Sequence, residues 1–179
     1  MLKKLLIAVL AITAVLAGVV AMQPAEFRIV RSATISAPPT TVFAQVNDFH
    51  HWQAWSPWAK LDPQAKNTFE GPAAGTGAIF KWSGNSQVGE GIMTLVESQP
   101  NERIIIKLEF VRPFAAINTV EFTFKPEGDQ TAVTWRMTGQ RNFLSKAFCL
   151  VMDMDKMVGG EFENGLAQMK VIAEAAAKK

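Results

Sequence analysis

The stretch TVEFTFKPEGDQTAVTWRMT at residues 119–138 decides the fold class, because it holds two alternating runs on either side of one turn. In both runs an apolar side chain occupies every second position, and polar side chains occupy most positions between them. Alternate residues of a strand point to opposite faces of a sheet, so each run predicts a strand with one buried and one exposed face. Glu127-Gly128-Asp129 supplies the turn that joins the two strands.

Further strand-like runs precede this pair and extend the sheet. They are bounded by Gly, Pro and Asn, which favour turns. We expect these strands at residues 27–35, 78–83, 88–96 and 103–110. After the first of them, Ala37-Pro38-Pro39-Thr40 opens one short helix, because the fixed φ of proline suits a first helical turn.

From Leu144 onward the chain predicts one long helix, because apolar residues recur there at helical spacing. Gly159-Gly160 interrupts the pattern and predicts a kink, which either follows the curve of the sheet or serves as a hinge that admits a guest. This helix is the only element long enough to cover the apolar face of the sheet. The element order therefore predicts an α+β fold in which a curved antiparallel sheet grips one long helix.

The inner face of this sheet carries large apolar side chains and almost no titratable ones. Such a face either packs as a solid core or leaves a hollow for a hydrophobic guest, and residue spacing does not separate the two. The candidate ligand-binding residues are Phe80, Trp82, Met93, Leu108, Phe110, Phe122, Trp135 and Met137 on the sheet, capped by Phe148, Met152 and Phe162 of the helix.

Few residues could carry acid–base chemistry in that hollow. His50 and His51 are the only histidines, and neighbouring residues point in different directions, so at most one faces a given site. Glu90 lies between two glycines that blur the strand register, and with Thr94 it is the candidate polar group inside the cavity. We expect no metal site, because no second histidine cluster is present to complete a metal shell. We also expect no cofactor.

A tryptophan segment lies within residues 49–63, where we expect a second short helix or turn. Trp52, Trp55 and Trp58 recur at every third position, which aligns them on one side of that element. Two interpretations remain open. The indoles pack in the core or a lid, or they form a pocket mouth or a membrane-facing patch, since indole suits a boundary between apolar and wet surroundings.

The first 22 residues are apolar apart from their start. Lys3 and Lys4 precede residues 5–22, in which Thr13 is the only polar side chain. At about 1.5 Å per residue this run extends roughly 27 Å, close to the thickness of a bilayer core. Residues 1–22 therefore form either a transmembrane anchor or a secretory signal, and the length of the run favours the anchor.

Both interpretations place the two lysines in the cytoplasm and the remaining chain on the other side of the membrane. The protein is then a single-pass membrane protein held through residues 5–22, or a secreted one if residues 1–21 are cleaved. Residues 23–26 form a linker, and we expect the folded domain over residues 27–177.

Composition excludes several classes of function. The formal net charge of the 179 residues is +2, and both extra positive charges come from Lys3 and Lys4, so the body of the protein is neutral. A neutral body argues against nucleic acid as a partner. A single cysteine, Cys149, excludes an intramolecular disulfide and a cysteine-based zinc site.

Three segments carry a resemblance to a known family. WQAWSPWAKLDP at 52–63, GEGIMTLVESQPNERIIIKLEF at 89–110 and MDKMVGGEFENGLAQMK at 154–170 are similar to bacterial polyketide cyclase/dehydrase-like members of the START-like, or SRPBCC, superfamily. The resemblance implies a helix-grip fold, with a curved seven-stranded antiparallel sheet around a long C-terminal helix and two short helices after the first strand. It also implies a deep hydrophobic cavity between the sheet and that helix. The N-terminal segment departs from the cytoplasmic members of the family, and it is this segment that predicts a location at the bacterial inner membrane with the domain on the periplasmic side.

Three functions follow from these expectations. The first is the binding of a small hydrophobic ligand (a lipid, an isoprenoid or an aromatic compound) by a membrane-tethered, non-catalytic domain. The second is an enzyme that acts as a cyclase, aromatase or hydrolase on a hydrophobic substrate and uses Glu90, His50 or His51. The third is an envelope protein that binds an unknown protein partner through an exposed tryptophan segment.

Overall fold

Seven antiparallel strands form one curved sheet, which confirms the predicted α+β helix-grip architecture. The computed structural model describes residues 1–178. The sheet order is β1-β7-β6-β5-β4-β3-β2, so the first strand pairs with the last at one edge. The strands are β1 (Glu26–Ile35), β2 (Lys66–Glu70), β3 (Ile79–Ser83), β4 (Glu90–Gln99), β5 (Arg103–Arg112), β6 (Ala116–Glu127) and β7 (Gln130–Gln140).

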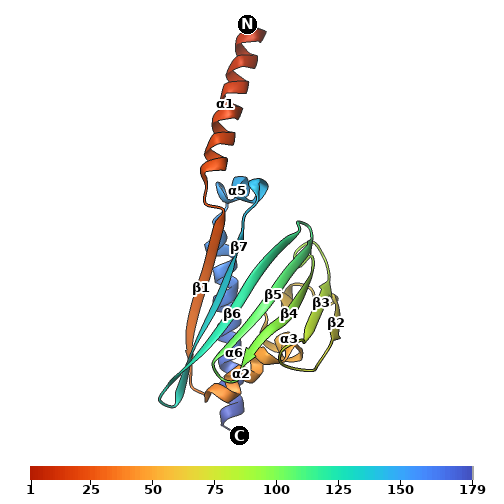
Figure 1. Ribbon diagram of the computed structural model, residues 1–179, viewed down its shortest axis with the longest axis vertical. Coiled ribbons are helices and arrows are strands. Elements are labelled where there is room, and N and C mark those ends of the chain that lie inside the picture. Colours follow the sequence, from red (N-terminus) through yellow and green to blue (C-terminus); the bar gives the residue numbers. More distant parts are fainter. Residues whose placement is uncertain (179) are drawn as a thin grey trace.

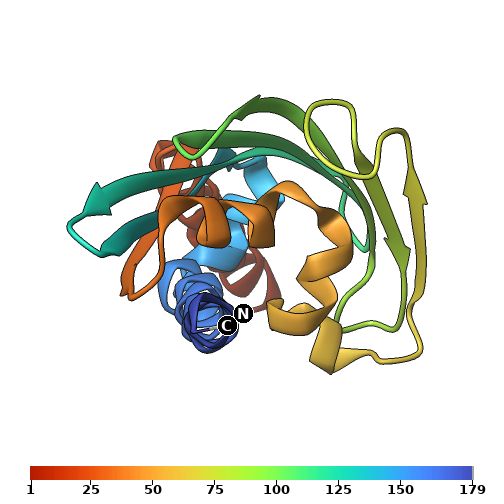
Figure 2. The same ribbon diagram turned by 90° about the horizontal axis from the view of Figure 1, so that it is seen from below.

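The helices lie on the concave side of the sheet, except for the first one. Figure 2 shows the sheet as an arc with the C-terminal helix and the short helices inside it. The first helix projects from one end of the domain, and the C-terminus lies at the other end (Figure 1). The helices are α1 (Leu2–Met22), α2 (Pro39–Asn47), the 3-10 turn η1 (Phe49–His51), α3 (Trp52–Trp55), α4 (Trp58–Leu61), α5 (Phe143–Cys149) and α6 (Met154–Ala177).

Strand β2 lies in a stretch whose sequence did not indicate a strand. It is an edge strand of five residues, and only Phe69 is partly buried. Without a buried face there is no alternation of apolar and polar side chains, so the usual strand signal is missing. Pairing with β3 in register, Phe69 opposite Phe80, is what holds it in the sheet.

The expectation of one continuous helix from Leu144 is wrong, because the chain forms two helices there. The Asn142 side chain accepts a hydrogen bond from the Ser145 amide and caps α5. The Asp153 side chain accepts one from the Lys156 amide and caps α6. Each cap satisfies an amide that has no partner within its helix, and residues 150–153 form the joint between them.

Gly159 and Gly160 both lie inside α6, which continues through them. Gly159 is required by a close approach, since a Cβ there would overlap the guanidinium of Arg31 from β1. Gly160 faces open space. Arg31 crosses the helix and binds Asp155 at 2.9 Å and Glu163 at 2.5 Å. Gly159 therefore makes room for the ion pairs of Arg31 with Asp155 and Glu163, which join β1 to α6 and are called the clasp below.

A short connection joins α1 to the domain. Only residues 23–25 separate Met22 from Glu26. The backbone amide of Arg141, just after β7, donates to the Ala25 carbonyl at 2.6 Å. The connection is therefore held against the end of the sheet.

We expect the two glycines to respond in opposite ways to alanine. Gly160→Ala should raise the free energy of unfolding by about 0.5–1 kcal/mol, because glycine is a poor residue inside a helix. Gly159→Ala should lower it, because the added methyl group displaces Arg31 from its carboxylates. Urea unfolding in mild detergent, followed by tryptophan fluorescence, measures both. Equal stabilisation by the two variants would contradict the clasp.

The clasp should also weaken in acid. Hydrogen bonds from Arg31 hold the pKa of Asp155 below its ordinary value of 3.8. A carboxyl group with a lowered pKa stabilises the fold above its ordinary pKa, and this contribution disappears as the pH falls through the lowered value. The effect should be small, because the Asp155 side chain is 58% exposed. As the pH falls from about 5 to about 3, the free energy of unfolding of the Asp155→Asn variant should therefore decrease slightly less than that of the native chain.

Candidate functional site

A cavity of about 420 Å³ lies between the concave face of the sheet and α6. Its wall includes residues from all seven strands and from the helices α3–α6. The volume falls in the range of small-molecule sites. Of the two alternatives left open by the sequence, a solid core is thus present in part, and a hollow lies beside it.

Aromatic side chains define the wall of the cavity. Trp135 of β7 stacks on Phe162 of α6, with ring centroids 4.0 Å apart and planes at 5°. Trp82 and Phe110 meet edge to face at 6.0 Å. Flat and edge-on ring contacts are favourable arrangements, so these contacts stabilise the wall of the cavity.

Eight of the predicted ligand-binding residues line this cavity. They occupy inward positions on the strands or on the inner face of α6, as the alternation indicated. They are Phe80, Trp82, Met93, Leu108, Phe110, Trp135, Met137 and Phe162.

Three predicted residues do not line the cavity. Phe122 is fully buried behind the wall, where its ring stacks on Trp135 at 4.9 Å. Phe148 and Met152 are exposed rather than capping the hollow. The reason is the joint at residues 150–153, which turns this segment away from the line that a continuous helix would follow.

Further residues, outside the predicted ligand-binding set, complete the wall. Trp52 and Trp58 line the cavity, while Trp55 is fully buried. The tryptophan segment is therefore core and cavity wall, and it forms no exposed patch. Asn118 also lines the cavity, and its position two residues before Val120 on the same face could have revealed it.

Asn118 and Trp135 carry unpaired polar atoms at this wall. Asn118 is 6% exposed, its Oδ1 has no partner among the described residues, and its Nδ2 lies 4.0 Å from the Met137 sulfur. Within residues 1–178, the indole Nε1 of Trp135 also has no partner. Buried polar atoms normally have hydrogen-bond partners, so these two atoms suit a ligand that carries polar groups.

The three candidate catalytic residues lie outside the cavity. Glu90 is not part of the cavity wall, and its carboxylate pairs at 2.6 Å with Arg112, which is. Thr94 is not part of the cavity wall either, since Met93 and Leu95 take the inward positions of β4. The imidazole of His51 bonds the Ala44 carbonyl through Nδ1 at 2.9 Å and is exposed.

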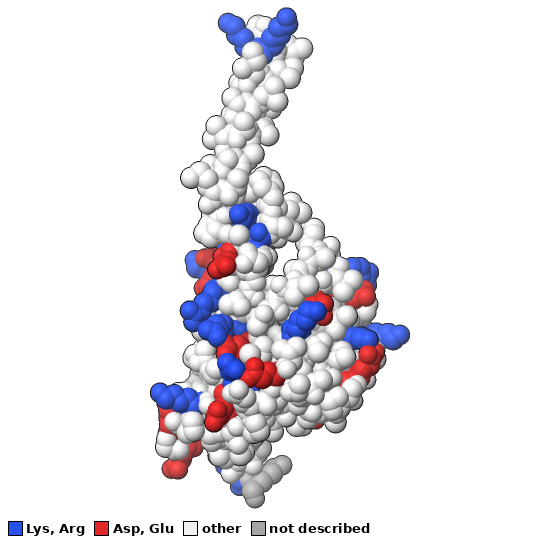
Figure 3. Space-filling view, viewed as in Figure 1, with Lys and Arg blue, Asp and Glu red and all other residues white. Residues whose placement is uncertain are grey.

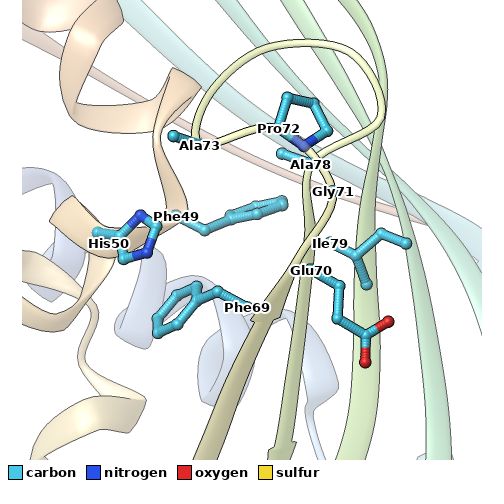
Figure 4. A pocket seen from close by; sticks show the side chains of 9 residues that line it. All are labelled: Phe49, His50, Phe69, Glu70, Gly71, Pro72, Ala73, Ala78 and Ile79. Atoms are coloured by element: carbon cyan, nitrogen blue, oxygen red, sulfur yellow. The ribbon is translucent and has the colours of Figure 1, made fainter.

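His50 borders a separate hollow of about 220 Å³ near the β2–β3 loop. Figure 4 shows its ring beside Phe49 and Phe69, with Glu70 turned away from the imidazole. Its Nδ1 lies 2.7 Å from an Asp48 oxygen, and its ring stacks on Phe69 at 4.1 Å. Partial burial of Asp48 opposes its ionisation, but hydrogen bonds from His50 outweigh that effect and hold the pKa of the carboxyl below its usual value. The pair caps a helical turn, since the His50 amide also donates to Asp48.

The titratable groups that line the large cavity are Asp62, Arg112, Arg141 and Cys149. Both Asp62 oxygens accept backbone amides, from Gln64 at 3.1 Å and Asn85 at 2.7 Å. The guanidinium of Arg141 lies 5.4 Å from the centre of the Phe27 ring. Over the described residues, no group of three His, Cys, Asp or Glu side chains could hold a metal ion.

The sequence profile of a family described as "Polyketide cyclase / dehydrase and lipid transport" matches residues 26–174. A search of curated proteins finds no match. Solved structures share the fold at low sequence identity. A crystal structure of protein CV1439 from Chromobacterium violaceum is 16% identical, with a TM-score of 0.59 over 85% of this chain and 99% of that chain.

Two further structures have the same architecture. The Aha1 dimer from Colwellia psychrerythraea is 15% identical, with a TM-score of 0.58 over 83% of this chain and 96% of that chain. The di-domain ARO/CYC StfQ of the steffimycin biosynthetic pathway is 12% identical, with a TM-score of 0.63 over 87% of this chain and 53% of that chain. At these identities the likeness shows the fold alone.

Two phenylalanines test whether the hollow is truly empty. Phe122→Ala should lower the free energy of unfolding by about 3–5 kcal/mol, because it removes a ring from tight packing. Phe110→Ala should cost less than half of that, because its ring already borders a void. Urea unfolding measures both, and equal losses would mean that the cavity is closed in solution.

Proposed function

Because this chain belongs to the polyketide cyclase/dehydrase and lipid transport family, we propose that it binds a small hydrophobic ligand in the cavity under α6. The observation that carries the proposal is the cavity of about 420 Å³ with a wall of aromatic and methionine side chains. Burial of apolar surface supplies the affinity for such a ligand, at about 25 cal/mol per Å². A lipid, an isoprenoid or an aromatic compound fits this chemistry.

The unpaired polar atoms suggest that the ligand is amphiphilic. Asn118 and Phe27 both lie against Gly139, where a Cβ would overlap them, and Arg141 sits over the Phe27 ring. A ligand hydroxyl at this end of the cavity would donate a hydrogen bond to Asn118 Oδ1, and a ligand carboxylate would accept one from the Arg141 guanidinium. The apolar part would then extend toward Trp135 and Phe162.

We propose that the domain is tethered to a membrane by α1. This helix is long and apolar enough to cross a bilayer, and 6% of its most apolar stretch is buried. Its last turn contacts α5, and Val20 is buried. A cleaved signal would lose this contact, which favours an uncleaved anchor with Lys3 and Lys4 in the cytoplasm and the domain outside.

An enzyme that acts on a hydrophobic substrate is the second candidate. The family description includes cyclases and dehydrases, and StfQ is named as an aromatase/cyclase. Such a reaction needs an acid–base group beside the substrate. Glu90, His50 and His51 do not line the cavity, and Asp62 is engaged by two backbone amides. Binding without catalysis therefore has the better support.

Ligand capture can be measured directly. The chain, purified in mild detergent, should release a bound lipid-like molecule in native mass spectrometry or solvent extraction. It should also bind a pyrene-labelled fatty acid. Leu108→Trp should weaken that binding at least tenfold, because the larger ring fills the cavity.

Val96→Trp is the matched control. Val96 lies on the same sheet but is exposed and outside the cavity wall, so its replacement should leave binding unchanged. If the native chain neither carries a molecule nor binds the probe, the proposed function is wrong. Equal weakening by both variants would place the probe outside the cavity.

A further inference from the structure

The segment from α5 to the joint before α6 exposes an unusual amount of apolar surface. Six large apolar side chains are each at least 36% exposed within ten residues. They are Phe143, Leu144, Phe148, Leu150, Val151 and Met152. Large contiguous apolar patches on a protein surface mark sites of interaction.

Helix α5 has two distinct sides. Ser145 and Cys149, four residues apart, line the cavity. Leu144 and Phe148, also four residues apart, are exposed. Residues at this spacing share one side of a helix, so α5 separates the cavity from the apolar patch.

The patch lies where α1 leaves the domain. Figure 1 shows α5 at the end of α1, and the Lys146 ammonium donates to the Ala21 carbonyl at 3.4 Å. If α1 spans a bilayer, Ala21 and Met22 lie at its surface. The exposed side chains of α5 are then at the same level.

A second apolar element lies across the hollow from α5. The β5–β6 turn points to the same end of the molecule as α1, and Phe114 within it is 66% exposed (Figure 1). Its neighbours Pro113 and Ala116 line the cavity. Figure 3 shows the surface hollowed between the region below α1 and the tips of the strands beside it.

The charges near the patch suit a lipid surface. Residues 141–153 contain two basic side chains, Arg141 and Lys146, and one acidic side chain, Asp153, which caps α6. Basic side chains around an apolar face favour binding at the interface of an anionic bilayer. The short connection at residues 23–25 keeps this face close to the membrane.

We propose that α5 and the β5–β6 turn rest on the bilayer that α1 spans, so that the cavity opens onto lipid and its ligand enters from the membrane. This inference rests on the proposed function and its tether. It explains why Phe148 and Met152 are exposed, since lipid covers them instead of protein. It also identifies the ligand class as an amphiphile that partitions into a bilayer.

The contact can be tested with the full chain in vesicles of phosphatidylethanolamine and phosphatidylglycerol. Cys149 is the only cysteine, so Cys149→Ala provides a background for single labels. A fluorophore on Leu144→Cys should be quenched at least twofold by lipids with a nitroxide on the acyl chain. The matched control is Val171→Cys, an exposed apolar position near the far end of α6, which should not be quenched.

Transfer of the ligand supplies a second readout. Leu144→Asp together with Phe148→Asp should slow uptake of the pyrene-labelled fatty acid from vesicles at least fivefold. Binding of the same probe added in detergent should be unchanged, and Val171→Asp should change neither. If the native chain does not bind the probe in detergent, the proposed function itself is wrong.

Two results would overturn membrane docking alone. One is equal quenching of the labels at positions 144 and 171. The other is quenching between position-144 labels on two chains with no quenching by lipid, which would make the patch an interface between copies.

Discussion

A mismatch of width between sheet and helix governs this structure. Seven strands at about 4.8 Å spacing extend roughly 29 Å, whereas a helix with its side chains is about 10–12 Å across. Helix α6 packs mainly on β1 and is fastened there by Arg31. Trp52, Trp55 and the short helices cover part of the remaining concave face. The uncovered rest is the cavity, so the hollow follows from the architecture rather than from any single residue.

The sequence predicted those parts of the fold that bury one face against the core. Residues such as Phe122 and Trp135 alternate with polar neighbours because one side of each strand meets solvent, and this periodicity is readable without a structure. Strand β2 was missed because an edge strand that buries little has no such pattern. The joint at residues 150–153 was missed because its apolar residues continue the helical spacing, and only the caps Asn142 and Asp153 mark the break.

The site was less predictable than the fold. Alternation identifies the inward residues but not which of them touch an empty space, so Phe122 and Trp135 looked equivalent although one is packed and one borders the hollow. The same limit affected the titratable residues. Glu90 lies at a register shift in β4, and the direction of its side chain depends on that irregularity. The identities of the neighbouring residues do not predict such a shift. Asn118 differs from these residues, because it is a polar residue at an inward position and does line the cavity.

The three residues between α1 and β1 restrict what an anchored domain can do. A fully extended connection of that length reaches about 10 Å, and the Arg141 amide holds its last residue against the sheet. A protein tied this closely cannot ferry cargo across an aqueous compartment to a second membrane. It would work as a stationary receptor, and any onward delivery would require the acceptor to come to it.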